Sequence, residues 1–226
     1  MVNYIGLYPG QGSQQPQMGL DLYKESEKVR SLFTLASDIS HANLYTLLKN
    51  GTIEDLTETA IAQLVITAVN RSASIILSER GYSPLAVAGF SLGELSAYRE
   101  AEVISDESLF TLVTKRGQLM AQNGDNIKDT YGDLAMAAII GLPFETVDTV
   151  IKESGIQSVW AANDNSVQQV VISGLRSSVE QIESVIKSSG ARRIIYLKVS
   201  GPFHTPLMNE AKEEFASLID DIPFCD

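Results

Sequence analysis

Residues 85–95 read LAVAGFSLGEL, an apolar run that enters a Gly-x-Ser-x-Gly turn. The wholly apolar stretch from Leu85 to Gly89 predicts a strand buried on both faces of a parallel sheet. A helix is expected to begin near Leu92. Strand, sharp turn and helix together are typical of a nucleophile elbow, which exposes the hydroxyl of Ser91 at the edge of the sheet. Glycines and serines also crowd purely structural turns, so the motif alone would be a weak signal.

The residues before this turn predict the rest of an α/β core. A strand is expected over Tyr4–Tyr8, followed by the glycine-rich loop GQGSQ. Apolar residues at helical spacing predict a long helix from about Thr57 to Arg80, which Gly81 would cap. Another helix is expected to start at Ser105 as N-cap. The polar segment Asn123–Thr130, NGDNIKDT, is interpreted as a linker.

Beyond this segment the pattern becomes strand, helix, strand, strand, helix, strand, and the last strand is RRIIYLKV, residues 192–199. That order is the ferredoxin-like unit, a split βαβ motif. The sequence therefore predicts an α/β fold with two domains. Residues 1–126 and 197–226 would form the core, and residues 127–196 would form an inserted ferredoxin-like subdomain.

Composition excludes several classes of function. The net charge of -11 argues against nucleic acid as a partner, because phosphate binding needs a basic surface. The single cysteine, Cys225, suits a reducing compartment, and the pattern lacks the Cys and His spacing of a metal site. The N-terminus does not resemble a signal peptide, and the uncharged apolar runs are too short to span a bilayer. We therefore expect a cytoplasmic protein with no metal and no membrane partner.

A serine nucleophile needs a base, and the chain contains two histidines. His41 lies in the polar stretch DISHANLY and is expected on the surface. His204 lies in SGPFHTPLM, in a loop that follows a predicted strand, where α/β sheets place their sites. His204 is therefore the candidate base for Ser91, although a loop histidine bonded to backbone would give the same pattern.

Arg116 carries the information about substrate. By helical spacing it shares a face with Leu109, Leu112, Val113 and Met120, so it is expected to point inward. A buried guanidinium is costly unless it meets an anion. The alternatives are an internal ion pair with a carboxylate, or a side chain that reaches back to solvent.

Five stretches in order carry a family resemblance: YPGQGSQ at 8–14, GFSLGE at 89–94, KRGQLM at 115–120, ANDNSVQQVVISG at 162–174 and GPFHTPLM at 201–208. Together they resemble the malonyl-coenzyme A:acyl carrier protein transacylases of fatty acid synthesis and the related polyketide acyltransferase domains. The resemblance covers nearly the whole chain. It implies an α/β-hydrolase-like core with a ferredoxin-like insertion, malonyl-CoA and acyl carrier protein as partners, and no cofactor.

Carried over by position, the resemblance implies that Ser91 accepts the acyl group and that His204 is its general base and later its acid. The backbone N–H groups of Gln11 and Leu92 would form the oxyanion hole.

The resemblance also assigns residues that meet the substrate. Arg116 would grip the malonyl carboxylate, a planar fork against a planar carboxylate. Asn163 and Phe203 match positions near the family's site. Leu92 and Phe203 fit the malonyl-selective pattern.

Two features depart from the family pattern. Phe90 stands where relatives usually carry a histidine that is not the base. The chain ends at DDIPFCD, whereas relatives continue with a strand whose carbonyl orients the base histidine, so we expect a C-terminally short chain. Alternatives to the transacylase are an acyltransferase of a polyketide pathway or a malonate decarboxylase, a serine esterase or thioesterase, and an inactive scaffold relative.

Overall fold

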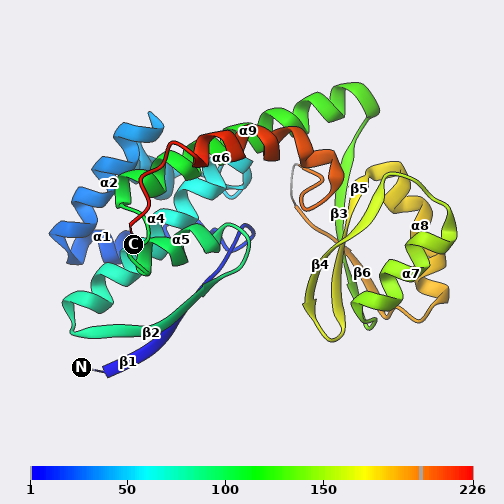
Figure 1. The fold of residues 1–226 in the computed structure, drawn as a ribbon, viewed down its shortest axis with the longest axis horizontal. Helices are drawn as coiled ribbons and strands as arrows, with labels where there is room; N and C mark the ends of the chain where they lie inside the picture. The colour runs from blue at the N-terminus through cyan, green and yellow to red at the C-terminus, as the bar shows by residue number, and fades with distance from the viewer. Residues whose placement is uncertain (1, 199–200, 226) are drawn as a thin grey trace. The chain divides into compact units, whose positions relative to one another are not determined.

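The computed structural model describes residues 2–198 and 201–225 (Figure 1). The chain contains both helices and strands, as predicted for an α/β protein. The chain divides into two units, residues 1–118 with 215–226 and residues 119–214. The domain limits expected from the sequence, 1–126 with 197–226 and 127–196, stay a prediction.

The first unit is built around one long helix and a small parallel sheet. The strands are β1 (Val2–Tyr8) and β2 (Tyr82–Gly89). The helices that lie wholly in this unit are α1 (Leu20–Glu25), α2 (Glu27–Ser40), α3 (Leu44–Asn50), the 3₁₀ helix η1 (Asp55–Thr57), α4 (Thr59–Glu79) and α5 (Gly93–Glu100). Helices α6 (Asp106–Tyr131) and α9 (Asn209–Ile219) each run from one unit into the other.

Helix α4 forms the core of the first unit. Its side chains belong to two apolar clusters: Leu64, Val65 and Ala68 pack with α2 and α3, while Ala62 and Ile66 pack with α5 and α6. The helix has the length and composition of a membrane span, but 67% of its most apolar window is buried inside the protein. This burial is typical of a core helix, because a helix that is apolar all round needs cover on every side.

Strands β1 and β2 pair in parallel, as the resemblance implied, with Tyr8 opposite Gly89. The prediction that Leu85–Gly89 is buried on both faces was wrong. Helices α4 and α5 cover the face that Gly6 and Tyr8 share, whereas Ile5, Leu7 and Leu85 are 66%, 74% and 71% exposed. An apolar run indicates a strand that needs cover, but it does not say which segment of chain supplies the cover.

The predicted linker Asn123–Thr130 was also wrong, because α6 continues to Tyr131. Asn123, Gly124 and Ile127 are buried at helical spacing, and Asn123 Nδ2 donates to Glu210 Oε2 at 3.3 Å. This stripe outweighs the low helix propensity of glycine and asparagine, which amounts to about 1 kcal/mol or less per residue. The helix begins as expected, since the Ser105 hydroxyl accepts the Ser108 N–H at 3.0 Å.

The second unit contains the predicted strand and helix order. Its elements are β3 (Leu134–Ile140), α7 (Phe144–Ser154), β4 (Val159–Ser166), β5 (Gln169–Leu175), α8 (Arg176–Ser188), β6 (Arg193–Tyr196) and the 3₁₀ helix η2 (Pro206–Met208). The strands form one antiparallel sheet in the order β4-β5-β3-β6, which is the ferredoxin-like arrangement. Helices α7 and α8 bury their apolar stripes against it. Val199, the last residue of the strand expected over 192–199, lies outside the described residues.

Glycines allow two loops of the first unit to touch through their backbones. A methyl group on Gly93 would lie 2.7 Å from the carbonyl carbon of Tyr8 and 2.9 Å from the oxygen of Pro9. One on Gly10 would lie 2.6 Å from the Phe90 carbonyl oxygen, and one on Gly89 would overlap the backbone of Gly93. The loop after β1 and the turn after β2 therefore pack directly against each other, backbone to backbone.

A cluster of four largely buried charged side chains joins three helices of the same unit; we call Arg71, Arg99, Glu100 and Asp106 the charged cluster. Arg71 Nε and Arg99 Nε donate to Asp106 Oδ1 at 2.7 and 2.8 Å. Arg71 Nη1 donates to Glu100 Oε2 at 3.1 Å, and the Tyr4 hydroxyl of β1 donates to Glu100 Oε1 at 3.2 Å.

The charged cluster shifts two pKa values. Burial alone would raise the pKa of Asp106, but the hydrogen bonds and charges of Arg71 and Arg99 outweigh it, so this pKa is lowered. Burial, followed by the charge of Glu100, raises the pKa of Tyr4 to about 12. Since the carboxylate of Asp106 is favoured in the folded state, its contribution to stability is present above the unfolded pKa and is lost as the pH falls through the folded value.

We expect Asp106→Asn to lower the free energy of unfolding at pH 7 by about 1–3 kcal/mol, the usual cost of losing hydrogen bonds to a charged group. The variant should also lose less stability than the wild type between pH 5 and pH 2. Urea unfolding across this pH range measures both effects. Glu25→Gln, which removes an exposed pair with Arg80, is the control and should lose as much stability as the wild type between pH 5 and pH 2. An equal loss for Asp106→Asn and wild type over this range would contradict the role given to Asp106.

We expect Gly93→Ala to destabilise the protein by at least about 2 kcal/mol, because its methyl group would displace backbone rather than a side chain. Gly81→Ala is the matched control: its φ is +81° and no atom lies within 4 Å of the added carbon, so it bears only the left-handed backbone cost of about 1–2 kcal/mol. Thermal unfolding compares the stability of the two variants. Only Gly93→Ala should also shift the backbone NMR signals of the loop at residues 9–14.

Candidate functional site

Ser91 lies in the sharp turn between β2 and α5. Its φ of 51° is in the left-handed region, which is uncommon for a residue with a side chain and typical of a strained functional turn. The turn is closed by hydrogen bonds from Gly93 N to Phe90 O at 2.9 Å and from Glu94 N to Ser91 O at 3.1 Å. The predicted strand, turn and helix around Ser91 are therefore present.

Arg116 reaches Ser91 from α6. Its Nη2 lies 3.5 Å from Ser91 Oγ, and its Nη1 donates to Gln63 Oε1 at 2.7 Å. The inward orientation predicted from helical spacing is confirmed, and burial lowers the pKa of Arg116 against the opposing charge of Glu94. Two residues of the predicted site, from separate elements, thus meet.

Gln63 is the site residue that the sequence analysis missed. It lies on α4 among the buried side chains of Leu64 and Val65 and is itself fully buried. An uncharged amide orients the guanidinium without forming an ion pair with it. Within the described residues the bonded partners of Arg116 are this amide and the Ser91 hydroxyl, not a carboxylate. The alternative of an internal ion pair is therefore not supported. The available signal was a row of buried polar residues at helical spacing on α4: Gln63, Thr67, Asn70 and Ser74.

The loop after β1 lies against the same turn. Phe90 N donates to Tyr8 O at 3.0 Å, which joins the loop to the elbow. Inside the loop, Gly12 N donates to Gln14 Oε1 at 2.8 Å. The side-chain Nε2 of Gln11 is buried and has no hydrogen-bond partner among the described residues. Leu92 is 1% exposed and packs in the cluster of Ala62 and Ile66. This apolar packing anchors the backbone that follows Ser91.

Three predicted site residues belong to the second unit and are described there. His204 is exposed, with φ 59°, in a turn where Thr205 Oγ1 donates to Pro202 O at 2.6 Å. Phe203 is buried with Met136 and Met208. Asn163 is half-buried on β4, at an irregularity in its pairing with β5. The meeting of His204 with Ser91 stays a prediction.

Phe90, the neighbour of Ser91 in the turn, is half exposed. A methyl group on Gly10 would lie 3.4 Å from Phe90 Cδ1, so the ring rests against the loop that carries Gln11. The position that is usually histidine in the family thus provides an apolar wall next to the serine.

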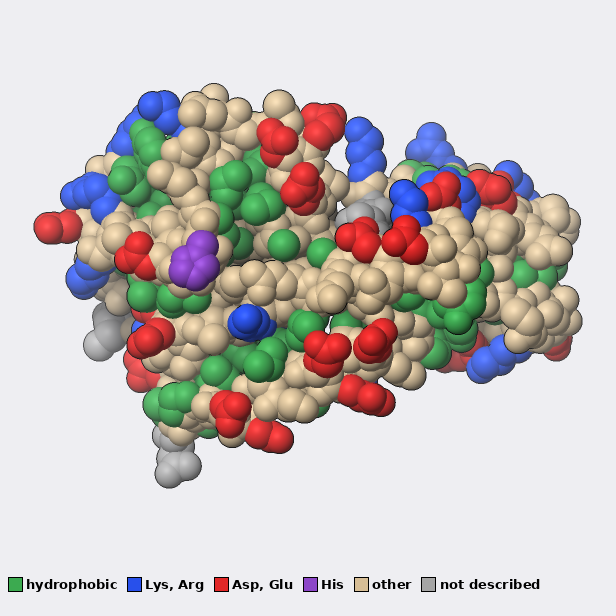
Figure 2. All heavy atoms as spheres, turned by 90° about the horizontal axis from the view of Figure 1, so that it is seen from above, with side chains coloured by type: hydrophobic (Ala, Val, Ile, Leu, Met, Phe, Trp, Pro, Cys, Tyr) green, Lys and Arg blue, Asp and Glu red, His purple; other side chains and the backbone are tan. Residues whose placement is uncertain are grey.

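Acidic side chains are scattered over the face drawn in Figure 2 and are interspersed with separate Lys and Arg side chains. This mixture agrees with the net charge of -11.

Comparison with known proteins gives a family and close relatives. Residues 5–224 match the model of the acyl transferase domain family. The chain is 37% identical over 218 residues to the malonyl CoA-acyl carrier protein transacylase of Bacillus subtilis (strain 168), covering 95% of this chain and 67% of that protein. It is 33% identical over 222 residues to the enzyme of the same name from Staphylococcus aureus (strain MRSA252), covering 97% and 70%.

Solved structures agree. The malonyl CoA-acyl carrier protein transacylase of Coxiella burnetii superposes with a TM-score of 0.91 at 31% identity, covering 99% of this chain and 70% of that one. A malonyl-transacylase solved in complex with its type II polyketide acyl carrier protein gives 0.89 at 34%, covering 100% and 72%.

Proposed function

The chain belongs to the acyl transferase domain family, and from that premise we propose that it transfers malonyl groups from malonyl-CoA to the phosphopantetheine thiol of acyl carrier protein in fatty acid synthesis. The observation that carries this proposal is the pairing of Ser91 with a guanidinium that an uncharged amide holds in place. A nucleophile beside a buried cation whose bonds go to an amide and a hydroxyl suits an acyl substrate that ends in a carboxylate. Malonyl thioesters have this form.

In the first half-reaction Ser91 Oγ attacks the thioester carbonyl carbon while His204 accepts the hydroxyl proton. The tetrahedral intermediate collapses, the carbon–sulfur bond breaks, and His204 returns the proton to the departing coenzyme A thiolate. A malonyl-serine ester remains. In the second half-reaction the carrier-protein thiol attacks this ester, His204 takes the thiol proton, and Ser91 regains it as it leaves. The exchange is ping-pong.

The backbone N–H groups of Gln11 and Leu92 would stabilise the oxyanion of both tetrahedral intermediates. Two features support this role: the two loops touch through glycine, and within the described residues neither N–H donates to a protein acceptor. Loss of one such donor typically costs on the order of 10²-fold or more in rate.

Arg116 would bind the malonyl carboxylate through its guanidinium fork and so select malonyl over acetyl groups. An acetyl group has no carboxylate, so it would leave the buried charge unpaired, which is the kind of loss that gives strong discrimination. Asn163 and Phe203 would complete the acyl pocket from the ferredoxin-like subdomain, and the apolar pair Leu92 and Phe203 would favour malonyl over its methylated homologue.

The chemistry needs no cofactor, because the activated thioester, the serine and the imidazole supply every group that reacts. We also propose that the enzyme acts in the cytoplasm. A serine thioesterase would use the same pair of side chains but release malonate to water, and a scaffold relative would form no acyl-enzyme at all. The acyl-enzyme and its acceptor therefore separate these functions.

Incubation with malonyl-CoA should add one malonyl group, about 86 Da, to Ser91, by the covalent mechanism above. Intact-mass spectrometry and peptide mapping measure the adduct. Ser91→Ala should form none, and His204→Ala should form it at least about 10³-fold more slowly. A label on another residue would end the proposal. Faster release to water than to a holo-carrier protein would instead support the thioesterase.

Arg116→Ala should lower kcat/KM for malonyl-CoA by about 10² or more, the order expected when one partner of a buried charge pair is removed. The much slower reaction with acetyl-CoA should change little. Arg116→Lys, which keeps the charge but loses the fork, should fall between. Lys115→Ala is the control, because this neighbouring cation is exposed and should leave both rates unchanged. Equal losses for malonyl-CoA and acetyl-CoA would refute the carboxylate role.

A further inference from the structure

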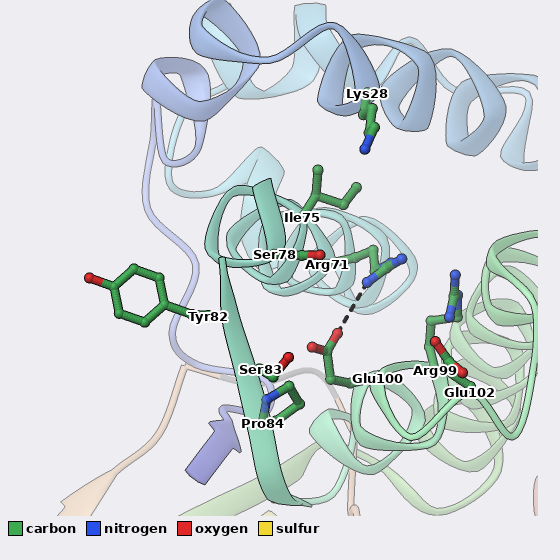
Figure 3. A pocket seen from close by; sticks show the side chains of 10 residues that line it. All are labelled: Lys28, Arg71, Ile75, Ser78, Tyr82, Ser83, Pro84, Arg99, Glu100 and Glu102. Atoms are coloured by element: carbon green, nitrogen blue, oxygen red, sulfur yellow. Dashed lines mark hydrogen bonds and ion pairs between the residues drawn. The ribbon is translucent and has the colours of Figure 1, made fainter. Parts of the chain in front are cut away.

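The charged cluster lies beside a cavity of about 250 Å³ in the first unit, shown in Figure 3. Arg71 and Glu100 point toward one another across it, from α4 and α5. The cations at this cavity are balanced locally: Arg71 and Arg99 bind Glu100 and Asp106, and Lys28 lies 3.8 Å from Glu79. Such internal balance suits a group that holds protein elements together rather than one that waits for an anionic ligand.

The elements joined at the cluster carry the candidate site residues of the first unit. Helix α4 bears Arg71 and, eight residues earlier, Gln63. Helix α6 begins at Asp106 and bears Arg116.

Ser91 and the loop after β1 also lie next to elements that reach the charged cluster. Helix α5 ends at Glu100 and begins two residues after Ser91. Strand β1 bears Tyr4 and leads into the loop of Gln11. The three helices thus each carry a member of the charged cluster, and β1 is tied to it by the bond from Tyr4 to Glu100.

The separation between cluster and site is short enough for rigid transmission. At 1.5 Å per helical residue, Arg71 lies about 12 Å along α4 from Gln63, and Asp106 lies about 15 Å along α6 from Arg116. Tyr4 and the end of β1 are about 13 Å apart at 3.3 Å per strand residue. A helix of this length moves as one body, so an axial shift at the cluster reappears at the site.

Apolar packing between α4, α5 and α6 constrains that register less sharply than hydrogen bonds do. Leu95, Leu109 and Leu112 fill the space between α4, α5 and α6, and contacts of this kind are non-directional. The bonds of Arg71 are directional: Nε binds Asp106 while Nη1 binds Glu100. One guanidinium on α4 therefore links α5 and α6 through bonds of defined direction.

We propose that Arg71 is a positioning residue for acyl transfer: by holding Glu100 and Asp106 it sets the register of Ser91 and Arg116 relative to Gln63. The proposal rests on the proposed function. Catalytic geometry tolerates little error, since a misplacement of about 1 Å can cost on the order of 10² in rate. A loosened cluster should therefore slow acylation of Ser91 in molecules that are otherwise folded.

The test is a single-turnover measurement with the full chain and malonyl-CoA, quenched and read by intact mass. It gives the acylation rate constant and the fraction of enzyme that becomes acylated. Arg71→Lys keeps the charge, but one ammonium cannot reproduce the two fixed bonds of the guanidinium. We expect its rate constant to fall about tenfold and its malonyl-to-acetyl preference to fall with it, while the acylated fraction stays at the wild-type value. Glu100→Gln should show the same pattern.

Two controls separate positioning from stability. Leu48→Ala leaves a cavity in the apolar core beside α3, a helix without site residues, and should lower the melting temperature but not the rate constant of the folded enzyme. Glu25→Gln removes an exposed ion pair and should change neither.

The outcomes are distinct. A wild-type protein that malonyl-CoA does not acylate would refute the proposed function itself. A wild type that is acylated, with unchanged rate constants in Arg71→Lys and Glu100→Gln, would refute positioning alone. A loss confined to the acylated fraction or the melting temperature would show that the cluster only stabilises the fold, and would overturn the proposal as well. If Arg71→Lys fails to fold, Glu100→Gln decides the question.

Discussion

The close backbone contact between the loop after β1 and the turn after β2 is the constraint on which the site depends. It exists because Gly10, Gly89 and Gly93 place no side chain between the two segments. The contact fixes the parallel register of β1 and β2, starts α5 directly behind Ser91, and brings the backbone of Gln11 to the elbow. A single Cβ at this crossing would force the loop that carries Gln11 away from the turn that carries Ser91.

The second constraint is the way a buried positive charge is held. Gln63 satisfies one nitrogen of Arg116 without supplying a counter-charge, so the guanidinium keeps its attraction for an acid. A carboxylate in the same place would pair with the guanidinium and compete with any acidic ligand. In the proposed function the amide would orient the fork and the substrate would supply the opposite charge.

Local pattern was enough to predict much of this from the sequence, and it was insufficient where distant segments decide. The elbow at Ser91, the inward face of Arg116 and the strand order of the second unit follow from spacing within short windows. Segment 123–130 was misassigned because polar composition was weighed above the stripe of Asn123 and Ile127.

The remaining differences have the same origin. The sequence does not indicate Gln63 or the charged cluster, because their partners lie at least 29 residues away along the chain, except for the pair of Arg99 with Asp106. The exposed side chains of β2 have a related cause, since periodicity indicates a face that needs cover but not the segment that covers it.

That exposed face has a practical consequence. Ile5, Leu7 and Leu85 lie on a two-stranded sheet, and within the described residues neither outer edge pairs with another strand. Open strand edges beside apolar side chains act as templates for intermolecular β-pairing. This chain, handled by itself, should therefore be prone to aggregate as it is concentrated, and the yield of refolding from denaturant should fall steeply with protein concentration even though the remainder of the fold is well packed.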